Sequence, residues 1–129
     1  ADGVQIGSRF IASPESTAHQ NFKDYILRAK EGDTQLTLKE ITPVRLLKNE
    51  FYQKLVAAYD DGATTEELKQ LLGRGRAKKG MFLGELEDGE LEVGQISAMM
   101  TTIKPAKEIV FEIIEEFEEV KNKMSKLVL

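Results

Sequence analysis

The sequence of 129 residues contains no cysteine, no tryptophan and a single histidine, His19. Without cysteine, the chain has no disulfide framework, no thiolate chemistry and no cysteine-based metal site. The lone histidine has no histidine–carboxylate spacing of the kind that holds a metal ion. Because this composition fits a reducing compartment, we expect a cytoplasmic protein without a bound metal.

The sequence also lacks a long apolar run and a strong charge of one sign. No stretch approaches the roughly 18 apolar residues that span a bilayer, and the start lacks the layout of a signal peptide. The formal net charge is -4 and 41% of the residues are hydrophobic. We therefore expect a globular protein with a modest core and with neither a membrane nor a nucleic-acid partner.

The opening stretch, "ADGVQIGSRF", has the pattern of a buried strand. Val4 and Ile6 alternate with Gln5, and the run stops at Gly7 and Ser8. This pattern predicts a β-strand that ends in a tight turn. From the residues alone, Gly7 and Ser8 form either an ordinary turn, which is the simpler interpretation, or a turn whose backbone N–H groups hold a phosphate.

A helix is predicted directly after this turn. Ser13 can cap it, Pro14 suits its first position, and Gly32 can end it. The apolar residues Phe22 and Ile26 recur at helical spacing inside it. Residues 1–32 thus read as one strand–turn–helix unit, and His19 is expected to be a surface or packing residue of its helix.

Residues 33–129 are predicted to be mainly helical, with one extended stretch over 34–47. Asn49 can cap a helix over 50–62, and Thr64 and Glu67 have the spacing of a capping box for the next. Short helical turns are expected at 76–79 and 95–100, and the strongest helix runs from 105 to about 125. Its apolar stripe comprises Ile109, Val110, Ile113, Ile114, Phe117, Val120 and Met124.

Charged clusters have plain explanations. The basic run from Arg74 to Lys79 could contact a nucleic acid, a cofactor phosphate or an acidic partner, but a solvated turn facing the acidic residues 85–92 is the simpler interpretation. The glutamates of the last helix form its solvated face.

The lone predicted strand is harder to explain, since one strand cannot form a sheet. Either it pairs with another chain or, as we favour, these residues are part of something larger.

Several stretches together resemble one enzyme family. "ADGVQIGSRF" looks like the last-strand motif of flavin-dependent nitronate monooxygenases and the similar flavin-dependent enoyl-ACP reductases, the enoyl-ACP reductase II group. "TPVRLLKNEF", "LLGRGRAKKG" and "EVGQISAMM" resemble later stretches of the same enzymes, in the same order. The likeness covers nearly the whole chain. It departs from the family at Ser97 and Ala98, where Ala-Gly is usual, and at Ser8, where Thr is commoner.

The resemblance implies an α/β fold, namely the C-terminal fragment of a TIM (β/α)8 barrel. Residues 1–32 would be the last β/α unit with its phosphate-binding turn, and 33–129 a mainly helical C-terminal extension. The cofactor would be FMN, with its phosphate lined by Gln5, Ile6, Gly7 and Ser8. Gly94 and Gln95 match a G-Q motif and would lie near the flavin or substrate pocket. The family's catalytic histidine lies upstream, so no catalytic residue is expected in this chain.

The implied reaction is the NAD(P)H-dependent reduction of enoyl-ACP thioesters in fatty acid biosynthesis. The alternative within the family is oxidation of alkyl nitronates by O2. The residues are expected to be inactive without the rest of the barrel, and a homodimer is consistent with the resemblance. Two alternatives from other classes stay open: a helical interaction module that uses its long last helix, and a small phosphate-binding domain that uses only Gly7 and Ser8.

Overall fold

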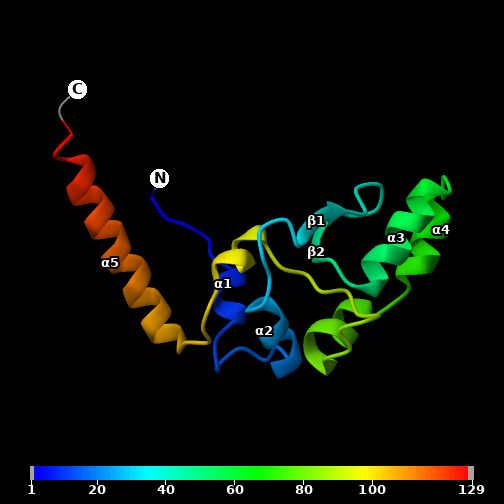
Figure 1. The fold of residues 1–129 in the computed structure, drawn as a ribbon, viewed down its shortest axis with the longest axis horizontal. Coiled ribbons are helices and arrows are strands. Elements are labelled where there is room, and N and C mark those ends of the chain that lie inside the picture. Colours follow the sequence, from blue (N-terminus) through cyan, green and yellow to red (C-terminus); the bar gives the residue numbers. More distant parts are fainter. Residues whose placement is uncertain (1, 128–129) are drawn as a thin grey trace.

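The computed structural model describes residues 2–127 and combines helices with one small sheet (Figure 1). Figure 1 shows a central body with α3 and α4 at one end and α5 reaching away at the other. The elements in chain order are α1 (Ser8–Ile11), α2 (Gln20–Ile26), β1 (Thr34–Thr37), β2 (Val44–Leu47), α3 (Glu50–Asp60), α4 (Thr65–Leu72), the π-helix η1 (Lys78–Phe82), the 3-10 helix η2 (Gln95–Met99) and α5 (Ala106–Met124).

The predicted opening strand is absent from this structure. Residues 2–7 have no regular secondary structure, and Val4 is 81% exposed. None of the backbone N–H groups of residues 3–7 donates to another backbone group in the described part of the chain. Among residues 2–127 this segment is therefore not a buried strand, because strand geometry is held by hydrogen bonds to neighbouring strands and none lies beside it there.

The first predicted helix begins later than expected, at Gln20 instead of Pro14. Ser13 does not cap it, because its Oγ donates to the carbonyl of Phe10 at 2.8 Å within a separate turn. His19 is the N-cap instead, and its Nδ1 accepts from the N–H of Asn21 at 3.1 Å. His19 was expected inside the helix, so its placement is corrected as well.

The stretch over 34–47, predicted to be extended, folds back on itself as an antiparallel hairpin. Thr34 pairs with Leu47 and Thr37 pairs with Val44. Pro43 keeps Thr42 out of helical geometry and precedes the second strand. The hairpin adds a small sheet to a region that was expected to be mainly helical, and an isolated bridge from Leu46 to Glu92 ties it to a distant segment.

The capping predictions for α3 and α4 are confirmed. The side chain of Asn49 accepts from the N–H of Tyr52 at 3.0 Å. Thr64 and Glu67 form a complete capping box, in which each side chain satisfies a backbone N–H of the other residue. These two helix starts were readable from sequence because a cap is made by residues three apart in the chain.

Two clusters of buried side chains form the core. The first joins the end of α1, α2 and β2 to the segments on both sides of η2, and it comprises Ala12, Phe22, Ile26, Leu47, Leu91, Val93 and Met100. The second packs the hairpin against α3 and α4, and it comprises Leu38, Leu46, Phe51, Leu55 and Leu68. Leu46 and Leu47 are adjacent in β2 and contribute to different clusters, so the hairpin is the element that both share.

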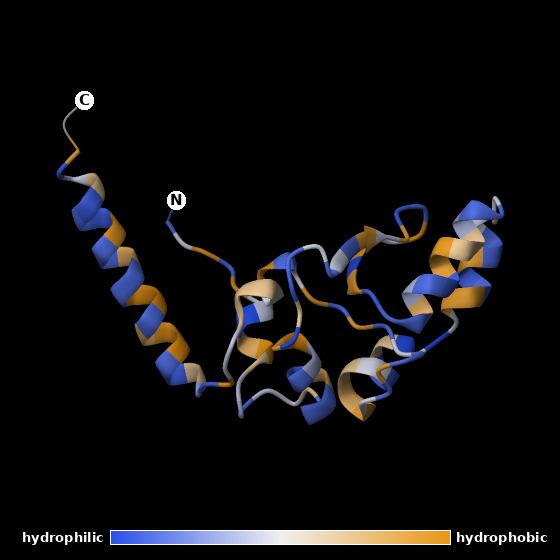
Figure 2. Ribbon diagram, viewed as in Figure 1, coloured by the Kyte–Doolittle hydropathy of each residue, from blue (hydrophilic) through white to orange (hydrophobic). Residues whose placement is uncertain are grey.

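The last helix lies largely outside this core. Figure 2 shows the hydrophobic residues of α5 along the side that faces the N-terminal segment and the body. Ile109 is buried, at 1% exposed, but Phe117 is 63% exposed and most of the predicted stripe is open to solvent. Contacts to the body come from its first turns, where the Glu112 carboxylate lies 3.9 Å from Arg9 of α1. Among residues 2–127, no helix is long and apolar enough to cross a membrane.

Candidate functional site

The predicted phosphate turn is open to solvent. Gln5, Ile6 and Gly7 are exposed, and Gly7 stands at the N-cap of α1 with no side-chain cap. A Cβ added at Gly7 would have no atom within 4 Å, so nothing in the described chain fills the space beside it. The backbone at Gly7 therefore allows a close approach by a group such as a phosphate.

The structure brings Ser8 and Gly94 together, although they lie 86 positions apart in the sequence. The backbone N–H of Gly94 donates to the Ser8 Oγ at 2.9 Å. Because a hydroxyl has one proton and two lone pairs, Ser8 keeps its own proton for a further acceptor. The two predicted groups of site residues, at the turn and at the G-Q motif, are thus parts of one location.

Gln95 follows Gly94 and lines an open groove of about 660 Å³ between η2 and the hairpin. Arg45 of β2 and Lys30 bring positive charge to the same groove, and Ile96 and Met99 bring exposed apolar surface. Arg45 and Lys30 were not predicted as site residues, because they come from segments at least 50 residues away from η2. Glu31 also lines the groove, so its two cations outnumber one carboxylate. Together with the apolar lining, this excess of positive charge suits a ligand with an anionic end and an apolar part.

Arg9, which follows Ser8, turns toward α5 instead of toward the open turn. Its Nη2 lies 3.9 Å from the Glu112 carboxylate, and its Nη1 is buried without a hydrogen-bond partner in the described chain. Glu15 makes a second tie between the two regions, since its carboxylate accepts from the N–H of Ala106 at 3.1 Å. These contacts fix the start of α5 beside α1.

The basic run holds the neighbouring acidic loop in place. Arg76 lies 2.7 Å from the Asp88 carboxylate, donates to the backbone carbonyl of Leu72 at 2.8 Å and stacks 4.4 Å above the ring of Phe51. Hydrogen bonds from Lys54 and then from Arg76 lower the pKa of Asp88. The expectation that the basic run faces the acidic segment is therefore confirmed at Arg76, but this side chain is only 18% exposed and is not the solvated group that was expected.

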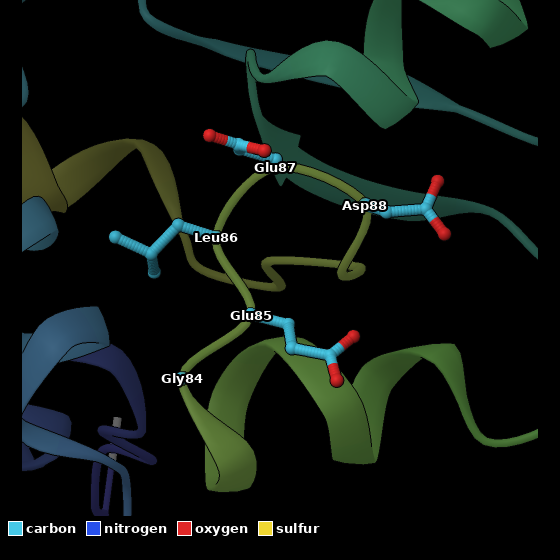
Figure 3. Close-up of a pocket in the computed structure, with 5 residues that line it drawn as sticks. All are labelled: Gly84, Glu85, Leu86, Glu87 and Asp88. Atoms are coloured by element: carbon cyan, nitrogen blue, oxygen red, sulfur yellow. The ribbon is translucent and has the colours of Figure 1, made fainter.

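A hollow of about 490 Å³ lies over the same acidic loop. Figure 3 shows Glu85 and Asp88 extending to one side of the loop and Leu86 to the other. Nearby, Glu90 is only 8% exposed, and burial, followed by the charge of Glu92, raises its pKa to about 7. With carboxylates as its charged lining, this hollow repels an anion such as a flavin phosphate.

The donors at the Ser8 turn fit a phosphate. Gly7 leaves space, and the Ser8 hydroxyl has a proton to donate. Within the described residues, no three histidine, cysteine or acidic side chains gather in a metal-binding group. The Nδ1 of His19 is engaged in capping α2, and a Cβ at Gly84 would lie 2.3 Å from it, so this histidine packs against the chain.

Comparison with known proteins identifies the family. The family model described as nitronate monooxygenase matches residues 1–116. The chain belongs to the nitronate monooxygenase family. Over 95% of its length it is 31% identical to a probable nitronate monooxygenase of Staphylococcus saprophyticus, and over 93% it is 28% identical to one of Staphylococcus aureus.

The solved structures agree with this assignment. FabK from Thermotoga maritima matches 99% of the chain with a TM-score of 0.84 and 32% identity, and a mutant of FabK matches with a TM-score of 0.80 and 33% identity. The chain spans 34% of the length of the two staphylococcal relatives and 40% of the FabK chain. This nitronate monooxygenase family chain thus corresponds to about a third of the length of these curated relatives.

Proposed function

We propose that this chain is part of an FMN-dependent oxidoreductase in which Gln5, Ile6, Gly7 and Ser8 hold the flavin phosphate. The match of the nitronate monooxygenase family model to residues 1–116 carries the proposal. The open space at Gly7 and the donor proton of Ser8 support it from the structure. The Ser8–Gly94 contact supports it further, because it joins the phosphate turn to the segment that the family resemblance placed near the flavin or substrate pocket.

In this proposal, the chain forms the last β/α unit of a TIM barrel and the C-terminal extension that follows it. The chain matches 34% of the length of its relatives, and two of its surfaces lack neighbours. Val4 is 81% exposed in a segment with strand-like alternation, and Phe117 is 63% exposed on the apolar side of α5. The rest of a barrel would pair with residues 2–7 as a strand and cover α5, so these residues alone would be inactive.

The preferred reaction is the reduction of enoyl-ACP thioesters. FMN held at this turn would supply the hydride-transfer chemistry that links NAD(P)H to the double bond of the thioester. This chain's own residues would bind and orient: backbone N–H groups at Gly7 and Ser8 and the Ser8 hydroxyl would hold the phosphate. Gln95, Arg45 and Lys30 line the groove of about 660 Å³. Its two cations outnumber its one carboxylate, Glu31, and this excess suits the acidic surface or anionic groups of an acyl carrier.

Nitronate oxidation by O2 is the second candidate. It is favoured by the names of the curated relatives, of which one is 31% identical to this chain. The reductase is favoured by the similarity of the residues after Asn49 to the reductase branch and by the TM-score of 0.84 to FabK. Both candidates use the same flavin phosphate turn, so the assignment of Gln5–Ser8 does not depend on the choice between them.

The test uses the purified full-length protein that carries these residues. We expect flavin absorbance, NAD(P)H oxidation with an enoyl thioester, and little O2 uptake with an alkyl nitronate. O2 uptake with the nitronate and no NAD(P)H oxidation would assign the second candidate. A colourless protein that takes up no added FMN would overturn the flavin proposal. If, in addition, the 129-residue chain folded as a stable monomer, a helical interaction module would become the better interpretation of this chain.

A further inference from the structure

We propose that Gly94 is a positioning residue for the flavin phosphate and not a residue of the substrate pocket. Its backbone N–H donates to the Ser8 Oγ at 2.9 Å, and this contact would set the direction of the Ser8 hydroxyl proton. The inference rests on the proposed function, because it assumes that Ser8 faces a phosphate. It goes beyond that function by giving a backbone group from the second half of the chain a role in cofactor binding.

The hydroxyl group itself supplies the first step. A serine Oγ carries one proton and two lone pairs, and the proton rotates to suit its surroundings. With one lone pair taken by Gly94, the proton of Ser8 has no acceptor among residues 2–127. A hydroxyl that already accepts one hydrogen bond is also polarised to donate a stronger one. The contact therefore prepares Ser8 to donate to an anion.

The need for glycine at 94 comes from Ser8 and not from the backbone. Gly94 has φ -69° and ψ 158°, which any residue can adopt. A Cβ at this position would lie 2.8 Å from the Ser8 Oγ but 3.6 Å from the Ser8 Cβ and 3.9 Å from the Ile96 Cγ2. Only the oxygen is too close, so an added methyl group would push the hydroxyl away and break the hydrogen bond.

Gly94 is itself held firmly by the body of the protein. The carbonyl of Gly94 accepts from the N–H of Ser97 at 3.0 Å, and the N–H of Val93 donates to the carbonyl of Arg45 at 3.1 Å. Val93 is 5% exposed and Ser97 is fully buried. Through Gly94, the position of the Ser8 hydroxyl is thus fixed relative to the hairpin and η2. Residues 2–7, which precede Ser8, make no backbone hydrogen bond to the hairpin or to η2.

Equilibrium binding of two flavins to the full-length protein tests this role. FMN carries the phosphate and riboflavin lacks it, so each variant is titrated with both. We expect Gly94→Ala to weaken FMN binding about tenfold, the effect of one hydrogen bond to a charged group, and to leave riboflavin binding unchanged. Ser8→Ala should show the same pattern. The double variant Ser8→Ala/Gly94→Ala should bind FMN no more weakly than Ser8→Ala, because the clashing oxygen is gone.

The outcomes separate the two proposals. Equal loss of FMN and riboflavin affinity in Gly94→Ala, or additive losses in the double variant, would overturn the positioning role. If Gly94→Ala failed to fold, recovery of folding in the double variant would support the predicted conflict with the Ser8 Oγ, and failure of both would refute it. A wild-type protein that binds neither flavin would instead overturn the proposed function on which the inference rests.

Discussion

The side chain of Asn49 joins the start of α3 to the turn at Gly89, 40 positions away. Its Nδ2 donates to the carbonyl of Gly89 at 2.8 Å and to the carbonyl of Leu86 at 2.7 Å. Its Oδ1 accepts from the N–H of Tyr52 at 3.0 Å. One amide group therefore caps a helix and satisfies two loop carbonyls, so the acidic loop is fixed to α3.

Replacement of Asn49 should cost more than the loss of an ordinary helix cap. Asn49→Ala removes the cap, worth about 1 kcal/mol, and leaves two loop carbonyls without a partner, each worth about 1 kcal/mol or more. We expect the free energy of unfolding to fall by about 3 kcal/mol in urea denaturation. Thr64→Ala is the matched control, because Thr64 only caps α4 and its loss should cost about 1 kcal/mol. Equal effects of the two changes would contradict the loop contacts.

Glu90 should make the protein less stable as the pH rises through the acid range. Burial raises the pKa of its carboxyl to about 7, above the value in the unfolded chain. Since the folded state then binds more protons than the unfolded state between about pH 4.5 and pH 7, stability falls over that interval. Glu90→Gln should remove this fall and raise stability at pH 8 by up to about 3 kcal/mol.

The control for this change is Glu92→Gln. The charge of Glu92 is the second cause of the raised pKa of Glu90, after burial. Its removal should therefore shift the pH dependence only slightly. The measurement is the free energy of unfolding, taken from denaturation curves between pH 5 and pH 8. If Glu90→Gln showed the same fall of this free energy with pH as the wild-type protein, the role of Glu90 would be contradicted.

Alanine at Gly89 should lower the stability of the fold, whereas alanine at Gly7 should leave it nearly unchanged. A Cβ at Gly89 would lie 2.2 Å from the Gly80 Cα and 2.3 Å from the Glu85 carbonyl oxygen, both backbone atoms that cannot turn aside. Gly89→Ala should thus lower stability by about 3 kcal/mol. Gly7→Ala meets no atom within 4 Å and should change stability by less than about 0.5 kcal/mol.

In the full-length protein, Gly7→Ala should still weaken FMN binding, because the added methyl group would enter the space assigned to the phosphate. Riboflavin affinity is the reference measurement, and it should not change. Unaltered FMN affinity in Gly7→Ala would show that the phosphate does not approach this turn.

Two residues of α5 should report whether a larger body covers its apolar side. Ile109 is 1% exposed, so Ile109→Ala should lower stability by about 3 kcal/mol. Phe117 is 63% exposed, so Phe117→Ala should change the stability of the 129-residue chain by less than about 0.5 kcal/mol. In the full-length protein the same change should cost about 3 kcal/mol, because the barrel would bury the ring. An equally small effect in both proteins would argue against a barrel partner.

Local features of this protein were predictable from the sequence. The caps at Asn49 and Thr64, the extent of α5 and the short helix η2 follow from contacts between residues a few positions apart. The family resemblance was likewise readable, because the order of its motifs is a property of the chain, and the family model confirms it over residues 1–116.

The tertiary structure alone decided where these local features lie relative to one another. It left Val4 and Ile6 without the strand neighbours that their alternation predicts, since a strand depends on partners that sequence spacing does not supply. It placed the Gly94 N–H on the Ser8 hydroxyl across 86 positions. Periodicity and capping act over a few residues, whereas a contact of that range depends on how the hairpin and both core clusters pack.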